Sequence, residues 1–86
     1  MNEELTQVRV LLQEILYEYR GLRPNLSLRC ISRKAGVNRY FLSKIMEGER
    51  SKVDLEQLLL LYKFFRNSDV LNSLIQKNLV KIESLI

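Results

Sequence analysis

The stretch that decides the fold is Leu26–Gly48, LSLRCISRKAGVNRYFLSKIMEG. Within it, Leu28, Ile31 and Ala35 recur at the three-and-four spacing of one helix face. Gly36 follows the last of them, where the end of a helix usually requires a positive φ. The sequence therefore predicts a short helix that ends in a tight turn at Gly36.

A second short helix is predicted directly after this turn. Ser27 and Asn38 are good N-cap residues for the first and second helix, because their side-chain oxygens can accept backbone N–H groups. Val37 is apolar and is expected to fill the corner, and Leu42 and Ile45 are expected to point inward. At about 100° per residue, the opposite face of the second helix carries these residues: Tyr40, Ser43, Lys44 and Glu47.

The stretch resembles the helix-turn-helix of the phage repressor and Cro superfamily, also called XRE-type. The resemblance rests on a small residue in the first helix, a turn glycine, the apolar residue after it and two inward aliphatics: Ser32, Gly36, Val37, Leu42 and Ile45. It implies an all-α, lambda-repressor-like bundle of four to five helices. It also implies a sequence-specific DNA-binding transcriptional regulator of phage, plasmid or bacterial type, with the helix 38–47 in the major groove.

The same resemblance suggests which side chains meet DNA. Arg39, Tyr40 and Lys44 fall where the family places contacts to bases or phosphates. Arginine can pair with guanine, whereas lysines mainly contact the backbone. The full set of expected DNA-binding residues is Ser27, Arg29, Arg33, Asn38, Arg39, Tyr40, Ser43, Lys44, Arg50 and Lys52.

The charge distribution points the same way. The segment 20–52 holds nine basic and two acidic residues, a net charge of +7, whereas the rest of the chain carries −3, which together give the overall +4. Such a concentration of positive charge is the electrostatic signature of a phosphate-backbone binder. The expected partner is therefore double-stranded DNA, with another regulator or RNA polymerase as further candidates.

Composition excludes several other classes. The 86 residues predict a single domain, 1–86. No apolar run is long enough to span a bilayer, and the first residues lack a signal-peptide pattern, so a cytoplasmic protein is expected. The chain has no histidine and one cysteine, Cys30, which is expected near the core. We therefore predict no enzyme activity, no metal and no cofactor.

Two longer helices are predicted on either side of the motif. One spans 3–20 and ends at Gly21; its expected inner face is Leu5, Val8, Leu12, Ile15, Leu16 and Tyr19. The other spans 55–66 and begins with Asp54 and Gln57, a capping-box pattern. Its expected inner face is Leu58, Leu59, Tyr62 and Phe65.

A last helix is predicted over 69–85. Five of its residues step by four, three, four and three, a 3.5-residue repeat with one polar member: Leu71, Ile75, Asn78, Ile82 and Leu85. Two interpretations stay open at this point. The helix packs on the helix 3–20 of the same chain, or these residues form the seam of a homodimer, and a broad apolar arc allows both.

A different functional class also fits the sequence. The motif could serve as the scaffold of an antitoxin-like or anti-repressor-like protein-interaction module, with the apolar last helix binding a partner. Leu28 stands where the superfamily often has glutamine, and Glu47 would repel a nearby phosphate. These two departures from the family pattern favour this alternative.

Overall fold

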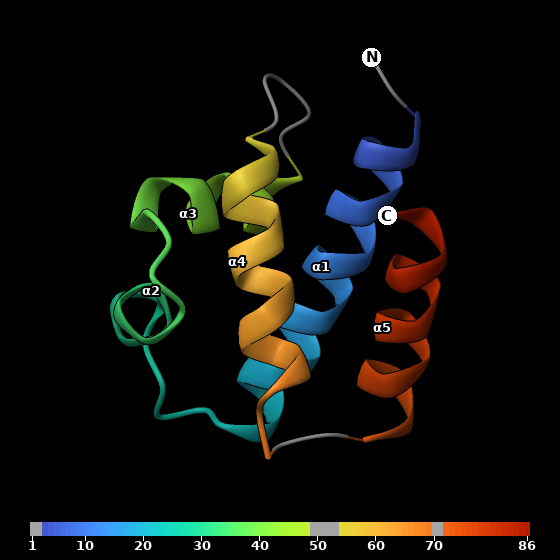
Figure 1. The fold of residues 1–86 in the computed structure, drawn as a ribbon. Coiled ribbons are helices and arrows are strands. Elements are labelled where there is room, and N and C mark those ends of the chain that lie inside the picture. Colours follow the sequence, from blue (N-terminus) through green and yellow to red (C-terminus); the bar gives the residue numbers. More distant parts are fainter. Residues whose placement is uncertain (1–2, 49–53, 70–71) are drawn as a thin grey trace.

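The computed structural model describes residues 3–48, 54–69 and 72–86, and within them the chain forms five α-helices and no strand. The helices are α1 (Glu3–Leu22), α2 (Leu28–Ala35), α3 (Arg39–Glu47), α4 (Leu55–Arg66) and α5 (Ser73–Leu85). Figure 1 shows α1, α4 and α5 running side by side, with α2 and α3 together at one side of α4. The predicted all-α bundle is confirmed at this level.

The core is centred on α1, which packs against α3, α4 and α5. Leu12, Ile15 and Leu16 are completely buried, at the spacing of one helix face. Burying a side chain of this size contributes about 1.5–3 kcal/mol. Of the predicted inner face of this helix, only Leu5 is partly exposed. No helix in the described ranges is long and apolar enough to cross a membrane.

Two predictions about α1 and α4 were wrong in detail. Helix α1 continues through Gly21 to Leu22, because glycine lowers helix stability without forcing the chain out of the helix. The helix ends one residue before Arg23, whose helical conformation Pro24 disfavours. In α4 the buried face is Leu58, Leu61, Tyr62 and Phe65, whereas Leu59 is only half-buried.

Helix α5 lies along α1 and completes the core of the single chain. It begins at Ser73, later than predicted, because the side chain of Asn72 caps it by accepting the N–H of Ile75 at 3.0 Å. Ile75, Asn78 and Ile82 are at most 3% exposed. Of the two interpretations left open for this helix, the structure shows the first for these three residues: they pack in the core of one chain.

The polar residue in this apolar stripe has a partner within the chain. The side-chain nitrogen of Asn78 donates to Oε1 of Glu14 on α1 at 2.9 Å, and that of Asn72 donates to Oε2 of Glu18 at 2.7 Å. The two glutamates are one turn apart on α1, and their hydrogen bonds to the two asparagines fix the register of α5 relative to α1. Of the other seam residues, Leu85 is half-buried against the core, and Leu71 lies outside the described residues.

Candidate nucleic-acid interface

The connection between α2 and α3 is a tight turn, as predicted. Ser27 caps α2 by accepting the N–H of Cys30 at 3.1 Å. Gly36 has φ +76° and donates its N–H to the carbonyl oxygen of Ser32 at 2.9 Å. A residue with a β-carbon is strained at this φ. Val37, only 5% exposed, fills the corner, so the chain changes direction within a few residues.

The beginning of α3 is held by two side chains. Oδ1 of Asn38 accepts the N–H of Tyr40 at 2.7 Å, the predicted N-cap. The backbone N–H of Asn38 in turn donates to Oε1 of Gln57 on α4 at 2.8 Å. Asp54 caps α4 as predicted, with Oδ1 accepting from Glu56 and Gln57. The Gln57 side chain, however, reaches across to α3, so the expected capping box gives a contact between helices.

The end of α3 is held from α1. The carbonyl oxygen of Met46 accepts two hydrogen bonds, from the hydroxyl of Tyr17 at 2.8 Å and from Nε2 of Gln13 at 3.1 Å. Gly48 follows with φ +77° and closes the helix by donating to the carbonyl oxygen of Ile45. The sequence alone leaves Tyr17 as an exposed apolar residue of no consequence or as part of an interface, and it does not indicate this hydrogen bond. Its i,i+4 spacing from Gln13 was the only signal that both could reach one acceptor.

The inner face of α3 is as predicted, whereas only Tyr40 and Glu47 of its predicted outer face are exposed. Leu42 and Ile45 are at most 1% exposed, whereas Tyr40 is 69% exposed. Nζ of Lys44 lies 5.0 Å from the centre of the Tyr40 ring and 3.8 Å from Oε1 of Glu47. Both interactions are weak at the surface, at about 1 kcal/mol or less each. They hold the Lys44 ammonium over α3 in the free protein.

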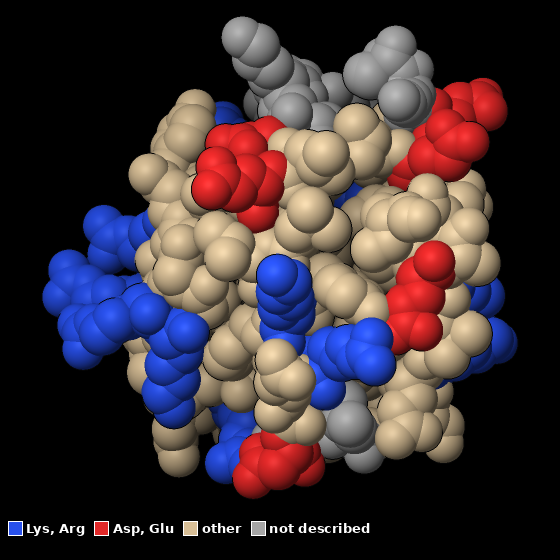
Figure 2. Space-filling view, viewed as in Figure 1, with Lys and Arg blue, Asp and Glu red and all other residues tan. Residues whose placement is uncertain are grey.

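The described side chains expected at DNA belong to α2 and α3 or to their N-caps. Figure 2 shows Lys and Arg gathering where Figure 1 places α2 and α3. Ser43 and Lys44 are half-buried, and Arg50 and Lys52 lie outside the described residues. The exposed members of the expected set are Ser27, Arg29, Arg33, Asn38, Arg39 and Tyr40.

In the part of the chain that the structure describes, no three His, Cys, Asp or Glu side chains are placed to hold a metal ion. Cys30 is half-buried and unbridged. The arrangement around α2 and α3 therefore offers exposed hydrogen-bond donors, positive charge and one large aromatic ring.

Comparisons with protein-family models, with curated proteins and with solved structures find no match to this chain.

Proposed function

We propose that this protein binds double-stranded DNA as a sequence-specific transcriptional regulator, with α3 in the major groove. The observation that carries the proposal is the exposed polar face of a short helix whose two ends are fixed by other helices. Gln57 holds its first turn, and Tyr17 and Gln13 hold its last. A reading helix must be rigid to discriminate between bases, since specificity depends on hydrogen-bond geometry.

The turn geometry and the charge support the same proposal. A capped helix, a glycine at positive φ and a second capped helix form the connection expected of a lambda-repressor-like helix-turn-helix. The exposed Arg29 and Arg33 belong to α2, which packs against α3, and both lie in the basic segment 20–52. Positive charge at this place would supply the phosphate contacts that position the reading helix.

Three polar residues of α3, namely Arg39, Tyr40 and Lys44, have proposed roles. Arg39, at the first helical position, would donate to O6 and N7 of a guanine. The Tyr40 ring would lie against a thymine methyl group, and its hydroxyl could donate to a phosphate or base. Lys44 would leave Glu47 for a phosphate oxygen, because a phosphate is a stronger partner than an exposed carboxylate in this setting.

A symmetric homodimer is part of the proposal. Two copies would place their α3 helices about 34 Å apart, one turn of DNA, and so read two half-sites. Because the buried side chains of α5 are committed to the core, the seam must use exposed residues. Val80, at 63% exposed, is the most exposed apolar side chain of α5. Sedimentation of the free protein, with and without DNA, tests this part.

Selection of bound fragments from genomic DNA, followed by mobility-shift titration, tests the proposed function. The expected result is a recurrent sequence bound more tightly than random duplex. Affinity should also fall with salt by a log–log slope of about −0.9 for each phosphate contacted. Absence of any enriched sequence, or an affinity that salt does not change, would reject DNA reading by this protein.

The alternative of a partner-binding module needs the apolar side of the last helix, which is covered in the single chain. The apolar residues Ile75, Leu79 and Ile82 are at most 6% exposed in the single chain. Binding a partner through them would require α5 to leave α1.

A further inference from the structure

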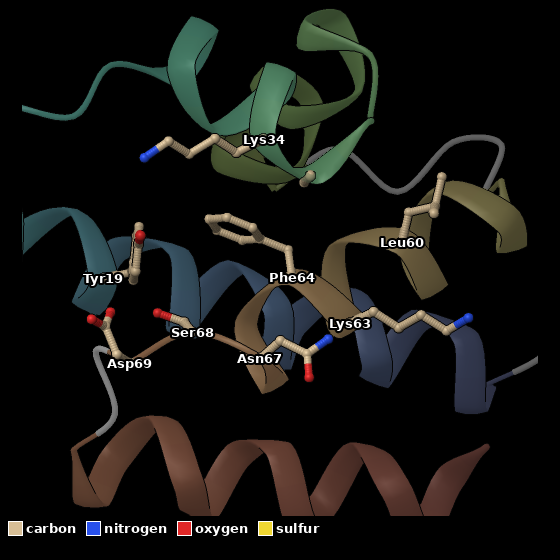
Figure 3. A pocket seen from close by; sticks show the side chains of 9 residues that line it. Tyr19, Lys34, Leu60, Lys63, Phe64, Asn67, Ser68 and Asp69 are labelled. Atoms are coloured by element: carbon tan, nitrogen blue, oxygen red, sulfur yellow. The ribbon is translucent and has the colours of Figure 1, made fainter.

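A groove of about 660 Å³ opens between the end of α2 and the outer side of α4. Figure 3 shows the ring of Phe64 pointing into this space, with Tyr19 beside it. The two rings meet edge to face, 5.7 Å between centroids, and Leu60 extends the apolar surface along α4. Phe64 is only half-buried, so the floor of the groove presents an aromatic surface to solvent.

The rim of the groove carries an unbalanced positive charge. Lys34 of α2 and Lys63 of α4 are exposed, and neither makes an ion pair with any residue that the structure describes. Their ammonium groups point toward opposite ends of the groove (Figure 3). Among the described residues of the rim, the only acid is Asp69, which lies 3.6 Å from the guanidinium of Arg23, and this contact offsets its charge.

We propose that this groove binds an acidic peptide segment of a protein partner, with one bulky apolar side chain of the segment on Phe64. Carboxylates on both sides of that side chain would meet Lys34 at one end and Lys63 at the other. The groove is open to solvent rather than enclosed, which suits an extended or helical segment better than a small molecule. Charge complementarity of this kind steers the encounter and sets the register of the segment.

The groove is separate from the surface proposed to meet DNA. None of the residues that line it belongs to α3, and the only part of α2 in it is the C-terminal end, Lys34 and Ala35. A partner could therefore occupy the groove while α3 contacts DNA. The inference goes beyond the proposed function and does not depend on it.

The test uses the isotope-labelled protein, residues 1–86, and designed ten-residue peptides. Binding is measured by the changes in the amide chemical shifts of the protein during a titration with each peptide. The probe peptide has a central leucine–phenylalanine pair flanked by aspartates and glutamates. One control peptide replaces every acid by lysine, and another replaces the central pair by two serines. The acidic apolar peptide is expected to shift the amides of Ala35, Phe64 and Asn67, which line the groove, and the two control peptides are not.

Charge reversal of the groove lysines supplies the matched variants. Lys34→Glu with Lys63→Glu should weaken binding of the probe by roughly threefold to thirtyfold, as expected for two exposed charge pairs. Lys77→Glu, a reversal at an exposed position of α5, should change it far less. All three sites are exposed, so the variants should fold, which their unchanged amide spectra away from the substitutions would show.

Several results would overturn the inference. The first is that millimolar peptide changes no amide chemical shift. The second is that the lysine peptide causes changes equal to those caused by the acidic peptide. The third is that the changes are centred on residues outside the groove. A loss of affinity with Lys77→Glu equal to that of the double variant would also overturn it. Groove shifts caused by duplex DNA alone would assign the lysines to nucleic acid instead. If the amide chemical shifts of the groove residues change with protein concentration in the absence of peptide, the groove binds a second copy of this chain instead.

Discussion

Oε1 of Gln57 accepts the backbone N–H of Asn38 at 2.8 Å, and this contact joins the first turn of α4 to the N-cap of α3. The same Asn38 residue caps α3 through its side chain. Asn38 is therefore hydrogen-bonded to α4 through its backbone N–H and to the first turn of α3 through its side chain. The orientation of α3 relative to the bundle depends on this pair as well as on the buried side chains beneath it.

Gln57→Ala should lower the free energy of unfolding by about 0.5–1.5 kcal/mol, because the N–H of Asn38 loses its protein acceptor. The matched control is Gln76→Ala, at an exposed position of α5, which should leave stability within about 0.5 kcal/mol of the wild type. Urea unfolding of the three proteins checks this. Equal stability of the two variants would mean that water accepts the N–H of Asn38 in place of Gln57 with no loss of unfolding free energy.

Tyr17 and Gln13 share the carbonyl oxygen of Met46, so their contributions should not add. Tyr17→Phe or Gln13→Ala alone leaves the carbonyl with one donor and should cost about 0.5–1 kcal/mol each. The double variant leaves no side-chain donor from α1 and should cost more than the sum of the two. A double-mutant cycle measured by urea unfolding tests this; strict additivity would mean that the two bonds act independently.

Local features of this chain could be predicted from the sequence because they depend on near neighbours. Ser27, Gly36 and Asn38 cap or end helices through residues within a few positions, and the structure confirms all three. The face of α4 was harder to predict. Four consecutive leucines, 58–61, satisfy more than one helix face, and only packing against the other helices selects Leu61 over Leu59.

Contacts between helices could not be predicted in the same way. Gln57 fitted a local capping box, yet its side chain bonds to Asn38, which is 19 residues earlier. Asn78 in an apolar repeat fitted a dimer seam, yet its partner is Glu14 of the same chain. In both cases the sequence identified a polar group that needs a partner, and only the tertiary arrangement determined which partner it has.

Ile82→Glu should unfold the chain, because the side chain is completely buried and a charge there has no partner. The control on the same helix is Val80→Glu, where the side chain is 63% exposed and the fold should persist. Circular dichroism and sedimentation of both variants check the prediction. If the wild type is a dimer and the Ile82→Glu variant is a helical monomer, Ile82 instead lies at the interface between two copies.

Tyr62 should titrate at higher pH than a free tyrosine. Desolvation raises the pKa of its hydroxyl, and so does the hydrogen bond to Glu83 at 2.6 Å, while Arg66 opposes them. Because the folded state then holds its proton longer, stability should fall as pH rises from about 10 through this raised pKa. Ultraviolet titration should show the raised pKa of Tyr62, and Glu83→Gln should lower it. A titration unchanged by Glu83→Gln would contradict the role of the carboxylate.

Arg39→Ala provides the most direct test of base reading by α3. The side chain is exposed at the first turn, so folding should hardly change, and the variant should keep the unfolding free energy of the wild type. If Arg39 pairs with a guanine, its loss should reduce discrimination between the selected sequence and random duplex by about 1–3 kcal/mol. Mobility-shift titrations on both duplexes measure this difference, with Lys77→Ala on α5 as the control for lost charge. An equal loss on both duplexes would make Arg39 a phosphate contact, because such contacts carry no sequence information. Unchanged binding to both would place Arg39 outside the interface and leave Tyr40 as the first residue to vary.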